Sequence, residues 1–146
     1  MTGPVTILHV EDDSNDALLF QHACQKAGVS CNLQVVSDGD EAIAYLRGET
    51  RFRDRQQHPL PGLVLLDLKM PRVSGFDVLS WIRNEVSYKR LPVVVLTSSN
   101  HGADVERAYD QGANSYLIKP VDFNRLVDLV KSLHHYWFAL NEQSGR

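Results

Sequence analysis

The sequence lacks most of the features that mark specialised protein classes. It holds two cysteines in 146 residues, Cys24 and Cys31, and no CxxC pair. This excludes a disulfide framework and the usual structural zinc sites, and it predicts two buried free thiols in a reducing compartment. No apolar run approaches the ~18 residues of a membrane span, and residues 1–4 lack the charged start of a secretory signal. The expected location is therefore cytoplasmic, with no membrane partner.

An excess of charge of one sign is also absent. The formal net charge is −3, and charged residues make up 23% of the chain against 43% hydrophobic residues. A basic surface for nucleic acid or anionic lipid is therefore not expected. The length and apolar fraction predict one globular domain over residues 1–146, with enough core for three layers.

The sequence does contain a regular alternation of strand-like and helical stretches. The strand-like runs occupy residues 5–10, 31–36, 63–66, 92–97 and 115–119. The helical stretches after them begin near Ser14, Asp38, Ser74, Gly102 and Asp122. Such alternation predicts an α/β fold, in which a parallel sheet with right-handed crossovers is covered by helices on both faces. The third run is continuously apolar, as in a strand buried on both faces.

Three details of this pattern are specific enough to check. Ser14 is the expected N-cap of the first helix, and Asp38 with Glu41 forms an expected capping box at the second. The fourth helical stretch is thinly apolar, and its expected anchors are Val105, Ala108 and Tyr109. Residues 48–62 carry no hydrophobic period but several arginines, so a solvated loop is the favoured interpretation and a partner contact the alternative.

Polar side chains follow four of the predicted strands at the edge where they end. Glu11 and Asp12 follow the first strand and Asp67 the third, while Thr97 and Lys119 end the fourth and fifth. In a doubly wound sheet of order 2-1-3-4-5 the first and third strands flank the switch point, so the three acids should converge. Two carboxylates ~4 Å apart repel by about 4 kcal/mol at an effective dielectric constant near 20. Lys119 and a hard divalent cation would offset this repulsion, and oxygen ligands beside open space suit Mg²⁺.

These groups together suit the uptake of a phosphoryl group. Asp67 would attack phosphorus, while Mg²⁺ and Lys119 would neutralise charge on the phosphoryl oxygens. The Thr97 hydroxyl would donate a hydrogen bond to one of those oxygens. Taken singly, each residue has an ordinary structural role, so the prediction rests on their combination.

The segments that carry these residues closely resemble the receiver domain of two-component response regulators. The matching segments are HVEDD at 9–13, LLDLKMP at 65–71 with Gly75, LTS at 96–98 and KP at 119–120. The resemblance covers about residues 5–135 and implies a flavodoxin-like fold. It also implies phosphorylation of Asp67 by a histidine kinase, with no enzymatic activity beyond self-phosphotransfer and autodephosphorylation.

The resemblance further implies a set of residue roles. The implied metal ligands are Glu11, Asp12, Asp67 and the backbone carbonyl of Lys69. Thr97 and Tyr116 would form a switch, in which the hydroxyl moves toward the phosphate and the aromatic ring turns inward. A cis peptide bond is implied between Lys119 and Pro120. The Lys69 side chain is expected beside the path of an attacking water, where it would alter the rate of phosphate loss.

Three features depart from the general receiver pattern. Glu11 replaces the commoner aspartate, and its longer side chain is expected to bind metal through water. The long loop before the Asp67 strand and the apolar tail after Leu133 resemble single-domain regulators of bacterial phytochrome kinases, which predicts such a kinase as partner. The 27 residues after Lys119 suffice for one helix and a polar end, so no DNA-binding output domain is expected.

The apolar tail also predicts a contact surface. A final helix that begins at Asp122 and matches the sheet in length would end near His134. Large apolar residues continue beyond it, to about residue 140: Tyr136, Trp137, Phe138 and Leu140. We expect them to project from the domain and form a homodimer. The alternative is a helix that bends back over its own core.

Three other functions are weaker matches. A flavin protein of this topology needs a phosphate-cradling loop after the first strand, and here that loop carries three acids. An aspartate-nucleophile phosphatase needs a second aspartate two residues after the nucleophile, where Lys69 stands. A receiver that is never phosphorylated is the third option, but every expected polar group is present.

Overall fold

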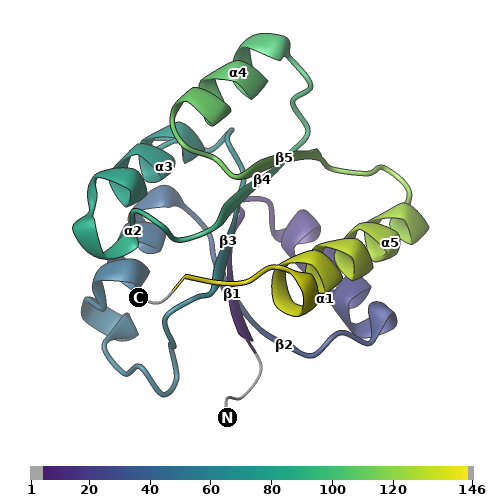
Figure 1. The fold of residues 1–146 in the computed structure, drawn as a ribbon, viewed down its shortest axis with the longest axis horizontal. Helices are drawn as coiled ribbons and strands as arrows, with labels where there is room; N and C mark the ends of the chain where they lie inside the picture. The colour runs from purple at the N-terminus through teal and green to yellow at the C-terminus, as the bar shows by residue number, and fades with distance from the viewer. Residues whose placement is uncertain (1–4, 145–146) are drawn as a thin grey trace.

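A five-stranded parallel sheet forms the centre of the protein, in the order β2-β1-β3-β4-β5 (Figure 1). The computed structural model describes residues 5–144, so both ends of the predicted 1–146 domain lie outside the described residues. The strands are β1 (Val5–Val10), β2 (Cys31–Val36), β3 (Leu63–Leu66), β4 (Val93–Thr97) and β5 (Ser115–Ile118). The predicted doubly wound, flavodoxin-like α/β sheet is confirmed.

Helices cover both faces of the sheet and complete three layers. On one face lie α1 (Ser14–Ala27) and α5 (Phe123–His134), which run side by side in Figure 1. On the other face lie α2 (Gly39–Arg47), α3 (Gly75–Asn84) and α4 (Gly102–Asp110). Single helical turns occur at Thr50–Phe52 and Val86–Tyr88, and a π-helical segment covers His135–Leu140. Within residues 5–144, no helix combines the length and the apolar character needed to cross a bilayer.

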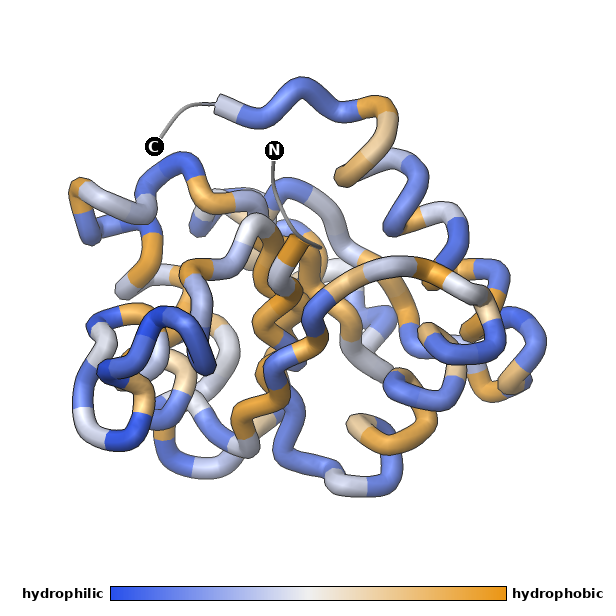
Figure 2. The backbone as a smooth tube through the Cα atoms, turned by 90° about the horizontal axis from the view of Figure 1, so that it is seen from below, coloured by the Kyte–Doolittle hydropathy of each residue, from blue (hydrophilic) through white to orange (hydrophobic). Residues whose placement is uncertain are grey.

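The core is thickest around β3. All four β3 residues are fully buried, as are Val93, Val94 and Val95 of the neighbouring β4. The tube coloured by hydropathy shows these strands as an apolar centre (Figure 2). The outer strands β2 and β5 are less buried, since each has only one strand neighbour. A strand with neighbours on both sides and helices on both faces requires a continuous apolar run, as the sequence predicted.

The helix ends differ from the predictions in detail. Asp13, not Ser14, is the N-cap of α1, and its carboxylate accepts hydrogen bonds from the amides of Asn15 and Asp16. At α2, Asp38 accepts from the Glu41 amide as expected. The Glu41 carboxylate, however, bonds to the residue before Asp38, so only half of the capping box forms. A complete capping box forms at α3 between Ser74 and Asp77.

Residues 48–62 are an irregular and mostly exposed segment, as the predicted solvated loop requires, but parts of it pack against α2. Phe52 is buried and lies 5.1 Å from the Tyr45 ring, measured between centroids. Arg55 donates hydrogen bonds to the carbonyls of Tyr45 and Leu46 at the C-terminal end of α2, which also accept from the Gly48 amide and the Tyr88 hydroxyl. Arg51 pairs with Glu41 at 2.5 Å. Two of the three arginines are therefore used within the domain.

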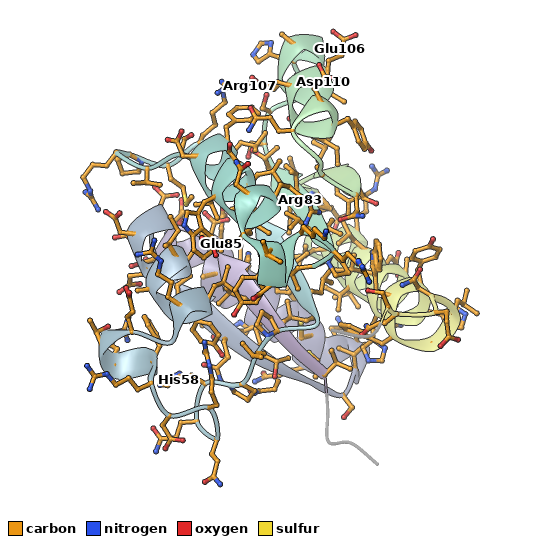
Figure 3. All side chains as sticks on the ribbon, turned by 60° about the vertical axis from the view of Figure 1, so that its left-hand side comes forward. His58, Arg83, Glu85, Glu106, Arg107 and Asp110 are labelled. Carbon is orange, nitrogen blue, oxygen red and sulfur yellow. The ribbon has the colours of Figure 1, made fainter. Side chains whose placement is uncertain are left out.

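Arg83 ties together the ends of several elements on the α3 side (Figure 3). Its guanidinium donates to the carbonyls of Gly112 at 2.9 Å and Leu91 at 2.7 Å, and to the Asn114 side chain at 2.9 Å. Asn114 in turn accepts from the Val93 amide at the start of β4. The C-terminal end of α4 and the first residues of β4 and β5 are thus held by one charged side chain.

The C-terminal segment partly folds back and partly projects. Trp137 is 9% exposed and belongs to the core cluster of the α1/α5 face, whereas Tyr136 is 52% and Leu140 64% exposed. The predicted projecting tail and the alternative, a helix that bends back over its own core, are therefore each correct for part of the segment. The implied cis bond between Lys119 and Pro120 is wrong, because residues 5–144 contain no cis peptide bond.

Candidate functional site

The three acids predicted to converge lie together at the carboxyl edge of the sheet. Val10 of β1 pairs with Leu66 of β3, so the next residues, Glu11 and Asp67, emerge side by side. Glu11, Asp12 and Asp67 each offer a carboxylate oxygen within 4.8 Å of the other two. Glu11 and Asp67 are buried, while Asp12 is exposed. The cluster is thus open to solvent on the Asp12 side.

Both oxygens of Asp67 have hydrogen-bond donors. Oδ1 accepts from the Thr97 hydroxyl at 2.8 Å and from the Lys69 amide at 3.3 Å. Oδ2 accepts from Lys119 Nζ at 3.1 Å. The structure therefore brings Asp67, Thr97 and Lys119 together as predicted, with the carboxylate oriented from both sides.

Lys119 contacts three acids at once. Its Nζ lies 2.6 Å from Glu11, 2.8 Å from Asp16 and 3.1 Å from Asp67. Burial of Lys119 opposes its charge, but the hydrogen bonds to Asp16 and Glu11 and the charge of Asp67 prevail and raise its pKa. Lys119 is therefore a permanent cation in the site at neutral pH.

The negative charge of the site exceeds what Lys119 can balance. Burial raises the pKa of Glu11 to about 7; the charge of Asp67 adds to this rise and the hydrogen bond from Lys119 opposes it. A carboxyl group that resists ionisation beside two further acids favours a second cation. The three oxygen donors fit a hard divalent ion such as Mg²⁺ or Mn²⁺.

Asp16 is a site residue that the sequence analysis missed. In the sequence it is only a favourable first-turn charge of α1, and it lies 103 residues from Lys119. Its side chain is 38% exposed and holds Nζ on the solvent side of the cluster. No local spacing rule predicts this contact, because it depends on how α1 packs beside the end of β5.

Gly75 is needed because α3 begins directly against the residues that follow β3. Its amide donates to the Leu68 carbonyl at 3.1 Å. A Cβ atom at this position would overlap the Asp67 carbonyl oxygen and the Leu68 backbone. The presence of glycine therefore allows the Asp67 loop and the start of α3 to touch.

Tyr116 lies on β5, three residues before Lys119. It pairs with Val95 in the sheet, and its hydroxyl donates to the Ser99 carbonyl at 2.9 Å. The ring is half-buried against the core of the α2/α3 face. The two predicted switch residues thus hold different atoms: Thr97 bonds to Asp67, and Tyr116 bonds to the loop between β4 and α4.

The Lys69 side chain points to α4 and not over Asp67. Its Nζ lies 3.0 Å from Asp104, which also accepts from the Ser99 hydroxyl at 2.6 Å. The hydrogen bonds from Ser99 and Lys69 hold the pKa of Asp104 below its usual value. The implied metal ligand, the Lys69 carbonyl, belongs to the loop whose amide bonds to Asp67.

His9 lies behind the acids on the α1/α5 face. It is 2% exposed, its ring centroid is 4.7 Å from that of Phe20, and its Nδ1 has no hydrogen-bond partner among the residues described. Burial lowers the pKa of His9 to about 4, and the positive charge of Lys119 acts in the same direction. His9 is therefore a neutral residue that adds no charge to the site.

Sequence comparison places this arrangement in a known family. Residues 7–131 match the family described as the response regulator receiver domain. The chain is 39% identical over 142 residues to FilR2 of Methanothrix harundinacea, named a probable methanogenesis regulatory protein, covering 97% of this chain and 89% of FilR2.

Solved structures agree in fold over almost the whole chain. The phosphorylated cyanobacterial phytochrome response regulator RcpA superposes with a TM-score of 0.88 at 34% identity, covering 98% of this chain and all of RcpA. RPA3017, from red light signalling in R. palustris, gives 0.92 at 34% identity, covering 97% and 99%. The Mn²⁺-bound form of response regulator Rcp1, which occurs in Synechocystis, gives 0.84 at 32% identity, covering 97% and 100%. This chain belongs to the response regulator receiver domain family.

Proposed function

We propose that this protein is a signalling switch in which Asp67 accepts a phosphoryl group from a histidine of a sensor kinase. A carboxylate oxygen of Asp67 would bond to phosphorus while the bond from phosphorus to the histidine nitrogen breaks, and the electron pair returns to that nitrogen. The observation that carries this proposal is the orientation of Asp67, held by a hydroxyl on one oxygen and an ammonium group on the other.

The residues around Asp67 have separate tasks in this reaction. Lys119 would balance charge on the phosphoryl oxygens, at the cost of its contacts with Glu11 and Asp16. The Thr97 hydroxyl, which now donates to Asp67, would turn to donate to a phosphoryl oxygen. Tyr116 would then lose its bond to Ser99 as the loop between β4 and α4 follows Thr97.

The site also suits a Mg²⁺ ion. Glu11, Asp12, Asp67 and the Lys69 backbone carbonyl would hold it, with Glu11 acting through water. The ion would supply the positive charge that the acid cluster lacks when a phosphoryl group approaches. Support comes from the three clustered oxygens, the raised pKa of Glu11 and the Mn²⁺-bound form of the relative Rcp1.

A phytochrome-type histidine kinase is the partner that the comparisons favour. RcpA is a phytochrome response regulator and RPA3017 acts in red light signalling. In this proposal residues 1–146 form one receiver domain, with its core at about 5–135 and an apolar extension to about 140. It acts in the cytoplasm through protein contacts, with no nucleic acid or membrane partner and no reaction beyond its own phosphorylation and dephosphorylation.

The exposed part of the extension suits a homodimer. Tyr136 and Leu140 are exposed, while Trp137 is buried within the domain. Replacing both exposed residues by serine should yield a monomer at tens of micromolar by light scattering, with phosphorylation intact. Val86→Ser, at a residue 83% exposed in a different segment, is the matched control and should remain dimeric. A wild-type protein that is monomeric with and without phosphate would exclude the dimer.

Substitution of the acceptor tests the central proposal. Asp67→Asn should abolish acid-labile, Mg²⁺-dependent labelling by acetyl phosphate and by a phytochrome-type kinase, because an amide is not a nucleophile here. Asp40→Asn, at an exposed carboxylate on α2, should keep full labelling. Labelling that survives in the Asp67 variant would refute the proposal.

A further inference from the structure

The two cysteines face each other at the edge of the sheet opposite the acids. Cys24 lies in the last turns of α1, and Cys31 is the first residue of β2. Between them Gly28 adopts a left-handed conformation with φ of 69°, and its amide donates to the Cys24 carbonyl. The Val29 amide reaches the same carbonyl at 3.4 Å, so the chain reverses tightly. The reversal brings two free thiols to the same surface cavity.

One of these thiols is covered and the other is accessible. Cys24 is 8% exposed and belongs to the core of the α1/α5 face, whereas Cys31 is half-buried. Both line a surface cavity of about 300 Å³ together with Gln21, Gln25, Val29 and Leu33. A small molecule in this cavity can therefore reach Cys31 with Cys24 beside it. The prediction of two buried free thiols is therefore confirmed for Cys24 and wrong for Cys31, which is only half-buried.

The neighbouring thiols are chemically unequal. Interaction with Cys24 lowers the pKa of Cys31, and this outweighs the opposing effect of burial. Interaction with Cys31, together with burial, raises the pKa of Cys24. The thiolate is the nucleophilic form of cysteine, so Cys31 has the character of an attacking thiol and Cys24 that of a resolving thiol.

We propose that Cys24 and Cys31 form a redox modification site that takes low-molecular-weight disulfides as its substrate. The Cys31 thiolate attacks one sulfur of the disulfide, which forms a mixed disulfide and releases the first small thiolate. Cys24 then loses its proton and attacks the Cys31 sulfur, which releases the second. Two protein thiols are oxidised, one small disulfide is reduced to two thiols, and excess dithiol reverses the reaction. In a reducing compartment the bond would form only transiently.

The site is separate from the phosphoryl-accepting acids. Cys31 begins β2, and the acids follow the opposite ends of the strands, so about six residues or ~20 Å of strand lie between the two. Phosphorylation of Asp67 therefore provides an independent check that a cysteine variant is folded. The proposal does not rest on the kinase or on the metal.

The test uses oxidised glutathione as the probe at neutral pH. Wild-type protein should lose both alkylatable thiols, and its intact mass should fall by two hydrogens with no adduct retained. Cys24→Ser should instead keep one stable glutathione adduct on Cys31. Cys31→Ser should react at least tenfold more slowly than Cys24→Ser, although each retains one cysteine. Peptide mapping of briefly alkylated wild-type protein should find Cys31 modified first.

Other outcomes overturn the proposal. Stable adducts on the wild-type protein would show that Cys24 does not resolve them. Disulfides only between molecules, or equal slow reaction of both single variants with labelling at Asp67 intact, would show that the pair has no special reactivity. If a variant loses Asp67 labelling, the mass change and peptide map of the wild-type protein decide alone.

Discussion

Helices α4 and α5 lie on opposite faces of the sheet and are attached in different ways. Helix α5 buries four apolar side chains, Leu126, Val127, Val130 and Leu133, and the segment after it buries Trp137. Helix α4 buries Ala108 alone among its nine residues, and Tyr109, an expected anchor, is 49% exposed. In Figure 3, α4 stands at the top of the molecule and carries Glu106 and Asp110.

Polar contacts take the place of an apolar face at α4. Asp104 binds Lys69 and Ser99, and the Arg107 guanidinium lies 4.0 Å from the Phe76 ring centroid. Lys69 follows Asp67 by two residues, and Ser99 follows Thr97 by two. A change of charge at Asp67 can therefore disturb the polar contacts of α4. The four buried side chains of α5 are apolar, so a change of charge affects their packing less. We therefore expect α4 to be the responsive helix and α5 the fixed one.

The largest effect expected on stability concerns the fixed helix. Trp137→Ala removes a large side chain from the α1/α5 core, so urea unfolding should reveal a loss of roughly 3–5 kcal/mol. Tyr136→Ala, at the exposed neighbour, is the control and should cost less than about 1 kcal/mol. Equal effects of the two substitutions would mean that α5 is not held by apolar burial at its end.

The pH dependence of stability sharpens the same comparison, because His9 is a buried polar residue on the α1/α5 face. Its pKa is about 4 in the folded protein and 6.5 when unfolded, so between these values the unfolded chain binds more protons. The contribution of His9 to stability is full above pH 6.5 and is lost as the pH drops toward 4, by up to about 3 kcal/mol. Relative to the wild-type protein, His9→Phe should lack this loss in urea titrations without metal.

Glu11 should act in the opposite sense in the same titrations. Its pKa is raised from 4.5 to about 7, so in that window the folded protein binds more protons and the contribution of Glu11 to stability is lost as the pH rises. Because this loss offsets the gain from His9 in the wild-type protein, Glu11→Gln should make stability rise more steeply with pH, and Asp40→Asn should leave the pH profile unchanged. Identical slopes in the wild-type protein and both site variants would exclude these assignments.

The contacts of α4 predict a local effect. Lys69→Ala should raise amide hydrogen exchange in α4 several-fold and leave α5 unchanged, because it removes the ion pair with Asp104. Arg72→Ala is the matched control, since Arg72 lies on the same loop with similar exposure but pairs with Asp38. Faster exchange in both helices would contradict the division between a responsive and a fixed helix.

The same Lys69 variant should alter the lifetime of the phosphorylated state. In the phosphorylated wild-type protein we expect Lys69 to leave Asp104 and approach the phosphoryl group. Lys69→Ala lacks this cation, so the hydrolysis half-lives of the two proteins should differ by more than twofold. Radiolabel decay measures this directly. A half-life unchanged within twofold would mean that Lys69 stays with Asp104 throughout.

The smallest effect is expected at Tyr116. Tyr116→Phe removes one hydrogen bond, from its hydroxyl to the Ser99 carbonyl, so the free energy of unfolding should fall by about 1 kcal/mol or less. Amide exchange in residues 98–101 should rise, with α5 again unaffected. A loss as large as that of Trp137→Ala would indicate that the hydroxyl has partners beyond this loop.

The sequence predicted most of the fold because the relevant signals are local. Apolar runs, N-caps and left-handed glycines such as Gly28 act over a few residues, and the alternation predicts a parallel sheet. The strand order 2-1-3-4-5 is that of the flavodoxin-like fold, which the resemblance to receiver domains implies. Contacts between distant side chains carry no such signal. The pairing of Lys119 with Asp16, the turn of Lys69 toward Asp104 and the burial of Phe52 depend on side-chain directions in packed loops. Ser14 was mistaken for the cap because Asp13 satisfies the same preference one residue earlier.

The guanidinium of Arg83 has a mechanical consequence for α4. It binds the Gly112 carbonyl beyond the C-terminal end of the helix, so that end acts as a pivot. Near the N-terminal end, Asp104 contacts Lys69 and Ser99 through its side chain. Nine residues make a lever of about 13 Å, and a rotation of about 10° at the pivot would displace the free end by ~2 Å. The helix would thus convert the small movement of a hydroxyl at Thr97 into a displacement that a partner protein can detect.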